Sequence, residues 1–193
     1  MRPENNQPQT APESAEERSV RTRMEVYDWV QCIVFALVAC ITVFVFFFRT
    51  IDVVGHSMEP TLQEGDKLIV TRLFYTPKYG DIVVLRKESF NEQPIVKRII
   101  ATEGQTVDID FDEGIVYVDD QPLDEPYIAE KTTRPIDFDG KVTVPEGCVF
   151  VMGDNRNKST DSRDAAIGMV DTRYIIGHEI IRLFPLNKFG FVD

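Results

Sequence analysis

One uninterrupted apolar block constrains this chain more than any other feature. Residues 29–48 read WVQCIVFALVACITVFVFFF, with no charged side chain and with only Gln31 and Thr42 as mildly polar interruptions. An α-helix of about twenty residues is about 30 Å long, which matches the thickness of the hydrocarbon core of a bilayer. The block therefore predicts one transmembrane helix.

Two other interpretations of the apolar block fit it less well. A buried helix in a soluble protein usually keeps a polar face, and this block has none. A cleaved signal peptide has a shorter apolar region of about 7–15 residues, with small residues at the cleavage site. Here the block ends in the bulky sequence FFFRTIDVV. We therefore expect the helix to be retained as an N-terminal anchor.

The basic residues around the block predict its orientation. Arg18, Arg21 and Arg23 precede it closely, whereas Arg49 is followed by no other Lys or Arg until Lys67. Positive residues near a span favour the cytoplasmic side. The N-terminus is thus expected in the cytoplasm and the protein in the plasma membrane. The expected parts are a tail at 1–28, a transmembrane helix at 29–48 and an extracytoplasmic domain at 49–193.

Composition narrows the possible partners. The first twenty residues are rich in Pro, Gln, Glu and Ser, so we expect the tail to be disordered. The whole chain carries a net charge of -11, which argues against nucleic acid as a partner because phosphates require a basic surface. The two histidines, His56 and His178, lack the spacing of metal ligands, so neither a metal nor a cofactor is expected.

The part of the chain after the apolar block predicts strands. Short apolar segments such as DIVVLRK, PIVKRIIAT and CVFVMGD alternate with turn signals such as YG, DEG and PEG, at about the 8–12-residue spacing of antiparallel sheet proteins. No long helical period follows residue 48. We predict an all-β domain of the sandwich or partly open barrel type. A free strand edge in such a domain suits an extended peptide substrate.

The segment GHSMEPTL at 55–62 contains the first candidate catalytic residue. Ser57 lies nine residues beyond the apolar block, a distance of at most about 30 Å, and therefore near the membrane surface. In the functional interpretation Ser57 is a nucleophile, and Gly55 lets a substrate backbone approach closely. Taken by itself, the segment is also explained by a turn, because Gly, Ser and Pro are common turn residues.

A serine nucleophile needs a base, and a lysine is the better candidate here. His56 would point to the opposite face of an extended strand, and His178 has the pattern of a strand-surface residue. Lys97, in PIVKRIIATEG, shares its face with two isoleucines. Burial lowers a lysine pKa and gives a neutral amine, whereas Arg98 would stay protonated. The alternative is a lysine with a buried stem and a solvated head.

The segment GDNRNKSTDSR at 153–163 is an unusual polar loop. It follows the apolar strand CVFVM and contains many side chains that bond their neighbours. An ordinary solvated loop is the alternative. Asp161 and Arg163 are suited to a charge-assisted pair, and Ser159 is suited to orienting an amine. The residues expected to support the site are Gly153, Asp154, Asn155, Arg156, Ser159, Asp161 and Arg163.

These segments together resemble the type I signal peptidases, membrane-anchored serine proteases that remove signal peptides from exported proteins. The resemblance rests on four boxes in the family's order, and it covers nearly the whole exported domain. The short stretch between Lys97 and Gly153 and the single anchor resemble the compact members typical of Gram-positive bacteria. The boxes are SMEPTL at 57–62, GDIVVL at 80–85, VKRIIATEG at 96–104 and GDNRNKSTDSR at 153–163.

The resemblance implies a role for each matching residue. Ser57 would be the nucleophile, which forms an acyl-enzyme, and Lys97 its general base. Ser159 would hydrogen-bond the lysine, and the N–H of Ser57 would be one oxyanion donor. Some members carry a serine where this chain has Gly55, so the second donor stays open. The metal-free reaction implied is hydrolysis of the preprotein amide bond.

The resemblance also implies the substrate: preproteins that bear signal peptides at the membrane, cut after small residues in an A-x-A pattern. We expect membrane lipid as a second partner. One alternative is a tethered, non-catalytic β-domain that binds extracytoplasmic peptides. A self-cleaving repressor, which shares the Ser–Lys chemistry, would have a DNA-binding module in place of the anchor. The residues expected to line the substrate pockets are Val53, Met58, Leu62 and Val96.

Overall fold

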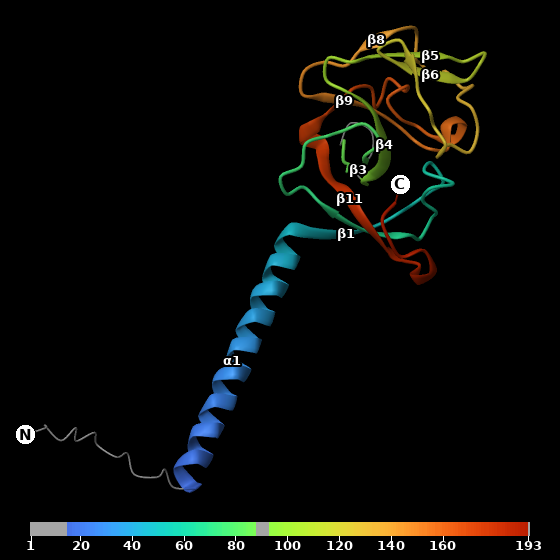
Figure 1. Cartoon of the computed structure of the whole chain (residues 1–193). Helices are drawn as coiled ribbons and strands as arrows, with labels where there is room; N and C mark the ends of the chain where they lie inside the picture. Colours follow the sequence, from blue (N-terminus) through green and yellow to red (C-terminus); the bar gives the residue numbers. More distant parts are fainter. Residues whose placement is uncertain (1–14, 88–92, 193) are drawn as a thin grey trace, which may run out of the picture. The chain divides into compact units, whose positions relative to one another are not determined.

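The structure is a computed structural model that describes residues 15–87 and 93–192. The chain divides into two compact units, residues 1–46 and 47–193. The described part of the first unit belongs to one helix, α1 (Ala15–Phe47), and the second unit is built from strands β1 to β11 with three short 3₁₀ helices (Figure 1). The second unit is an all-β domain, as the sequence predicts.

Helix α1 is long and apolar enough to cross a membrane, and it is the one such helix among the described residues. Its apolar side chains are exposed, as a helix surrounded by lipid requires. It begins at Ala15, so the expectation of disorder through residue 28 is wrong for residues 15–28. Residues 1–14 lie outside the described part of the chain. The helical extension is rich in Glu, Arg and Met, which favour helices, and the adjoining apolar helix removes the cost of nucleation.

The larger sheet has seven strands in the order β1-β2-β11-β3-β4-β9-β10, and all neighbours are antiparallel. The sheet curls into a partly open barrel (Figure 1). Strand β1 starts at Phe48, the residue at which we expected the transmembrane helix to end. The strands are β1 (Phe48–Asp52), β2 (Lys67–Thr71), β3 (Ile82–Leu85), β4 (Ile95–Thr102), β9 (Cys148–Met152), β10 (Val170–Asp171) and β11 (Ile175–Phe184).

The smaller sheet has the strand order β7-β6-β5-β8 and covers one end of the domain (Figure 1). Its strands are β5 (Thr106–Asp110), β6 (Ile115–Val118), β7 (Gln121–Pro122) and β8 (Val142–Thr143). Strands β5 and β6 alternate between buried and partly exposed residues, the pattern of a sheet with one face on the core. The 3₁₀ helices are η1 (Arg156–Lys158), η2 (Thr172–Tyr174) and η3 (Leu186–Lys188).

Strand β4 is the central element of the domain. Its side chains enter all three apolar clusters of the core: Ile100 packs between the two sheets, Val96 packs against the segment after β1, and Ile99 packs against β9 and β11. All residues of β4 between its first and last are buried. The two charged residues of this strand, Lys97 and Arg98, are therefore enclosed by the core and need partners there.

Candidate active site

Ser57 and Lys97 lie in direct contact. The Nζ atom of Lys97 is 2.8 Å from Oγ of Ser57, and it donates a second hydrogen bond, of 2.9 Å, to the carbonyl of Val96. Ser57 lies in the turn region after β1, whereas Lys97 lies on β4, so the fold joins two positions 40 residues apart. Lys97 is only 3% exposed. The lysine head is therefore dry, unlike that of a snorkelling side chain.

Burial determines the ionisation of this amine. It lowers the pKa of Lys97 to about 8. The carboxylates of Asp161 and Asp154 oppose the shift because they favour the ammonium form, and the guanidinium of Arg163 adds to the lowering. An ordinary lysine is almost wholly protonated at neutral pH. Here a useful fraction is neutral and able to accept the proton of the serine hydroxyl.

Neither histidine takes the place of Lys97. The exposed ring of His56 pairs with Glu59, with Nδ1 2.9 Å from the carboxylate oxygen, and its Nε2 lies 3.8 Å from Glu64. His178 lies on β11 and stacks on Tyr75, with the ring centroids 4.1 Å apart. Both side chains thus have neighbours other than Ser57.

The loop at 153–163 lies against the turn that carries Ser57. The backbone N–H of Asn155 donates to the Ser57 carbonyl at 3.0 Å, and its side-chain amide donates to the His56 carbonyl at 3.0 Å. Gly153 fits between the two segments, because a Cβ there would collide with the carbonyl oxygen of Ser57 and the side chain of Ser159. This close approach explains why a glycine stands at the first position of the 153–163 segment.

Asp161 and Arg163 form the expected pair. The guanidinium donates to both carboxylate oxygens at 2.8 and 2.9 Å, and both side chains are fully buried. Asp161 also accepts a 3.0 Å hydrogen bond from the backbone N–H of Gly153, and Arg163 donates to the carbonyl of Arg134 at 2.9 Å. A bidentate, charge-assisted pair of this kind fixes the loop beside the lysine.

Ser159 is the supporting residue whose observed contacts differ from the implied ones. Its side chain is buried against Gly153, but its hydroxyl has no hydrogen-bond partner among the residues that the structure describes. The implied bond to Lys97 is absent from this conformation, because the amine is directed to Ser57 and Val96. The unpaired hydroxyl remains close to the site, since Gly153 touches both serines.

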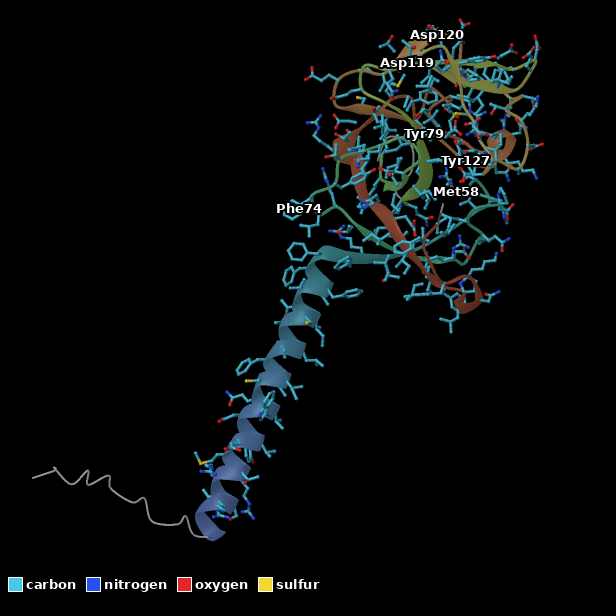
Figure 2. All side chains as sticks on the ribbon, in the orientation of Figure 1. Met58, Phe74, Tyr79, Asp119, Asp120 and Tyr127 are labelled. Carbon is cyan, nitrogen blue, oxygen red and sulfur yellow. The ribbon has the colours of Figure 1, made fainter. Side chains whose placement is uncertain are left out.

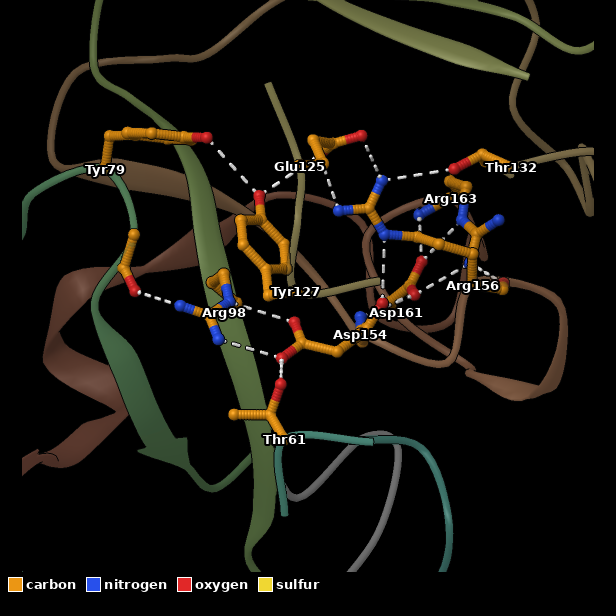
Figure 3. Close-up of polar contacts among 12 residues, drawn as sticks. Thr61, Tyr79, Arg98, Glu125, Tyr127, Thr132, Asp154, Arg156, Asp161 and Arg163 are labelled. Carbon is orange, nitrogen blue, oxygen red and sulfur yellow. Dashed lines mark hydrogen bonds and ion pairs between the residues drawn. The ribbon is translucent and has the colours of Figure 1, made fainter. Parts of the chain in front are cut away.

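A buried network that the sequence analysis missed surrounds Arg98 (Figure 3). Its guanidinium donates to both oxygens of Asp154 at 2.9 Å and to the Gly80 carbonyl at 2.9 Å. The hydroxyl of Thr61 donates to the same carboxylate at 2.5 Å. This network joins all four boxes of the sequence. An arginine within an apolar strand was the available signal, because a buried guanidinium requires a buried anion.

The segment between the small sheet and the loop completes the network. Arg156 is fully buried and donates to both carboxylate oxygens of Glu125, at 2.9 and 2.6 Å, and to the hydroxyl of Thr132 at 3.1 Å. The ring of Tyr127 lies over Arg98, with 4.0 Å between the guanidinium carbon and the ring centroid (Figure 3). No sequence pattern distinguished Glu125 or Tyr127, because each is an isolated residue in a long irregular segment.

The four expected pocket residues all belong to the core. Val53 and Val96 keep a little exposed surface, whereas Met58 is 1% and Leu62 0% exposed. They pack with one another below the Ser57 turn. Met58 and Leu62 therefore have almost no exposed surface here, and both side chains hold the turn to the core.

The all-β domain brings a serine hydroxyl and a lysine amine into contact, and the family to which the chain belongs is one of serine endopeptidases. The chain belongs to the signal peptidase family, peptidase S26, which it matches over residues 26–184. Cleavage of signal peptides by a serine protease is the activity of this family, and preproteins bearing signal peptides are its substrates. Membership and the apolar helix α1 both fit a single-pass membrane protein.

Two relatives agree with this membership. The chain is 42% identical over 146 residues to the probable signal peptidase I-1 of Synechocystis, covering 70% of this chain and 71% of the relative. It is 35% identical over 189 residues to signal peptidase I of Bacillus licheniformis, covering 92% and 99%. A crystal structure of a signal peptidase I from Enterococcus faecalis is 31% identical, with a TM-score of 0.46, and covers 54% of this chain and 97% of that one.

Proposed function

We propose that Ser57 and Lys97 hydrolyse the preprotein through an acyl-enzyme. The neutral amine of Lys97 accepts the proton of the Ser57 hydroxyl as its oxygen attacks the scissile carbonyl. The resulting ammonium protonates the leaving amine. A water molecule activated by the same amine then releases the acyl group. The observation that carries the proposal is the 2.8 Å contact between a serine oxygen and a buried lysine nitrogen.

The remaining site residues have positioning roles in this mechanism. The backbone N–H of Ser57 is proposed as one oxyanion donor, and a second backbone N–H or a water supplies the other, since Gly55 has no side chain. Asp161 and Arg163 hold the loop against the lysine. Ser159 has a buried hydroxyl without a hydrogen-bond partner among the described residues. This hydroxyl is proposed to accept a hydrogen bond from the Lys97 ammonium after Lys97 has taken the proton of Ser57. Gly153, Asp154, Asn155 and Arg156 keep the loop in place. These steps need no metal or cofactor.

We propose that the cut follows small residues in an A-x-A pattern. The apolar walls that support this specificity are Val53 and Val96, which keep a little exposed surface, with Met58 and Leu62 packed behind them. A shallow apolar pocket accepts an alanine methyl group and has no room for a larger side chain. We further propose that the N-terminus lies in the cytoplasm and the β-domain lies outside the plasma membrane, because the arginines that precede the span favour the cytoplasmic side.

Purified, detergent-solubilised protein and a purified preprotein test this mechanism. Ser57→Ala and Lys97→Ala should each abolish cleavage, since positioned proton transfer alone contributes about 10²–10⁴-fold. Lys97→Arg should be equally inactive, because a guanidinium keeps its proton. Lys141→Ala, which removes an exposed lysine paired with Asp120, is the matched control and should cleave normally. Retained cleavage by Lys97→Ala would refute the assignment. A merely modest change in peptide affinity would instead favour the non-catalytic binding domain.

A further inference from the structure

We propose that Arg182 is a positioning residue for the nucleophile. Its guanidinium holds residues 53–66, which we call the nucleophile turn, so that the Ser57 hydroxyl stays within reach of the Lys97 amine. The proposal rests on the proposed function and deepens it. It gives the nucleophile a support from strand β11, an element that carries none of the four boxes.

The Arg182 guanidinium contacts the nucleophile turn at two points. Its Nη2 atom donates a 2.7 Å hydrogen bond to the carbonyl of Thr61, in the middle of the turn. Its Nη1 atom lies 3.5 Å from a carboxylate oxygen of Asp66, at the end of the turn. There the Asp66 carbonyl accepts a 2.8 Å hydrogen bond from the backbone N–H of Val53, which closes the turn. One planar guanidinium thus connects the middle of the turn with its base.

These contacts are shielded from water. Arg182 is 8% exposed and Asp66 is 3% exposed, so each charge depends on the other for compensation. Asp66 is fixed as well, because its carboxylate accepts a 3.0 Å hydrogen bond from the backbone N–H of Gln63. A charged donor also binds a carbonyl more strongly than a neutral donor does. The buried guanidinium is therefore suited to restraining the turn.

The backbone of Arg182 is held on two sides. On one side it pairs with Leu68 of β2. On the other side its N–H donates to the Gly190 carbonyl at 2.8 Å, and its carbonyl accepts from the Gly190 N–H at 3.3 Å. Val192 then packs against the apolar cluster that contains Met58, and Figure 2 shows Met58 on the side of the domain to which this segment returns. The guanidinium thus extends from a fixed point.

Thr61 transmits this support to the nucleophile. Its hydroxyl donates to Asp154 at 2.5 Å, and its carbonyl accepts from Arg182, so Thr61 is held from two directions. A 2.9 Å hydrogen bond from the Leu62 N–H to the Met58 carbonyl closes the short stretch between Thr61 and the nucleophile. Displacement of Thr61 therefore displaces the serine hydroxyl relative to the lysine amine.

Arg182→Met tests the positioning role in the full-length, detergent-solubilised protein, because methionine fills space like the arginine stem and has no donor. A displacement of about 1 Å costs on the order of 10²-fold in rate, so kcat for a short peptide should fall about 10–100-fold. The value of kcat/KM should fall equally, since the loss affects the reacting atoms. Arg173→Met, which removes an exposed arginine paired with Asp171, is the matched control and should retain the wild-type rate. An unchanged kcat in Arg182→Met would overturn the proposal.

A second substitution separates positioning from stability. Arg182→Met leaves the Asp66 carboxylate buried without a charged partner, which lowers the free energy of unfolding. Adding Asp66→Asn removes that unpaired charge, so the unfolding midpoint should return towards the wild-type value. The cleavage rate should stay low, because the Thr61 carbonyl still lacks its donor. Recovery of the rate together with the midpoint would show that Arg182 acts through stability alone, which contradicts the proposal.

A pH–rate profile distinguishes displacement of Ser57 from exposure of Lys97. Burial lowers the pKa of Lys97 to about 8 in the wild-type protein. In Arg182→Met the plateau of the profile should fall, while its midpoint should stay at the wild-type position, since Arg182 does not enclose the amine. A midpoint that moves to about pH 10, the value of a solvated lysine, would overturn a role confined to the serine.

Hydrogen exchange measures the support without requiring catalysis. Amides of the nucleophile turn such as those of Leu62 and Gly65 donate hydrogen bonds within the turn. Peptides that cover the turn should exchange severalfold faster in Arg182→Met than in the wild type or in Arg173→Met, whereas peptides that cover β5 and β6 should be unchanged. Unchanged exchange in the turn would overturn the proposal. A wild-type protein that cleaves no peptide would instead refute the proposed function, and exchange would still decide whether Arg182 holds the turn.

Discussion

At the scale of single residues, the environment of Lys97 determines the chemistry. An amine in water would be protonated far above neutral pH, but the enclosed position on β4 lowers the pKa of Lys97 to about 8. Two carboxylates, Asp154 and Asp161, limit that shift. Each carboxylate is itself paired with an arginine, so the lysine sits among balanced charges. The site therefore keeps a base near neutral pH without exposing it to water.

The pKa of Lys97 predicts the pH dependence of cleavage. Only the neutral amine accepts a proton, and its fraction grows as pH rises through about 8. The value of kcat/KM for a short peptide should therefore rise with pH below that point and level off above it, since this ratio reports ionisations of the free enzyme. A pH–rate profile in detergent measures it. An acid limb between pH 4 and 6 would point to a carboxylate or histidine base instead.

Gly153 shows how one missing methyl group shapes the site. A Cβ at this position would collide with the Ser57 carbonyl oxygen and with Ser159. Gly153→Ala should therefore displace the nucleophile, and a shift of about 1 Å costs on the order of 10²-fold in rate. Preprotein cleavage measures the loss, and circular dichroism checks the fold. Adding Ser159→Ala should not restore the rate, because the collision with Ser57 remains. Normal cleavage by Gly153→Ala would contradict this account.

At the scale of elements, β4 connects the core with the site. Its central position in the curled sheet buries Lys97 and Arg98 side by side, and the partners of the two residues come from distant segments. Arg98 is held by Asp154 of the 153–163 loop, which also accepts from Thr61 of the nucleophile turn. The buried ion pair thus has a geometric role: it fixes the loop and the turn against the strand that carries the lysine.

The Arg98–Asp154 pair predicts a large loss of stability when it is broken. Arg98→Met would leave the carboxylate of Asp154 buried without its partner, which costs about 3–5 kcal/mol in the free energy of unfolding. Denaturant unfolding in detergent measures the change. The control is Arg173→Met, which removes the arginine of an exposed pair with Asp171 and should change the unfolding midpoint little. Equal effects of the two substitutions would argue that Arg98 has no special role.

The strands were largely predictable from sequence, but their arrangement was not. Alternating apolar residues and turn signals indicated segments such as β3, β4 and β9, because periodicity is a local property. Strand β1 was missed because Phe48 continues the apolar block, and β7 and β10 were missed because each has two residues. The order β1-β2-β11-β3 depends on pairing between distant segments, which no local pattern encodes.

The candidate site, like the strands, was only partly predictable from the sequence. Lys97 could be proposed from the sequence because it lies between isoleucines. Ser57 could be proposed because its segment lies near the membrane and matches a box of the family. Arg98 carried the same signal, but its partner Asp154 lies 56 residues away. The contacts of Tyr127 and Glu125 arise only when an irregular segment folds back over the site. Whether the Ser159 hydroxyl finds a hydrogen-bond partner depends on its side-chain rotamer, which the sequence does not specify.

At the scale of the whole molecule, helix α1 and the β-domain are suited to different surroundings: the helix to lipid and the domain to water. Helix α1 exposes apolar side chains throughout its membrane-spanning length, whereas the β-domain encloses three apolar clusters of its own. The domain therefore does not need the helix to complete its core. The anchor instead limits where Ser57 can act, because β1 begins at Phe48 and few residues separate the lipid from the nucleophile.

Orientation across the membrane is the property that links these parts to function. Arg18, Arg21 and Arg23 precede the span, so the positive-inside rule predicts that they lie in the cytoplasm and that the β-domain lies outside. With the three native cysteines replaced by alanine, a cysteine at the exposed position Asp120 should react with a membrane-impermeant maleimide in intact spheroplasts. A cysteine at Ser19 should react only after lysis. Replacing the three arginines by glutamate should reduce the labelled fraction at position 120, because the charge bias is lost. Labelling of the cysteine at position 19 in intact spheroplasts would show the opposite topology. Ser57 and Lys97 would then lie on the cytoplasmic side, where they could not meet preproteins after export.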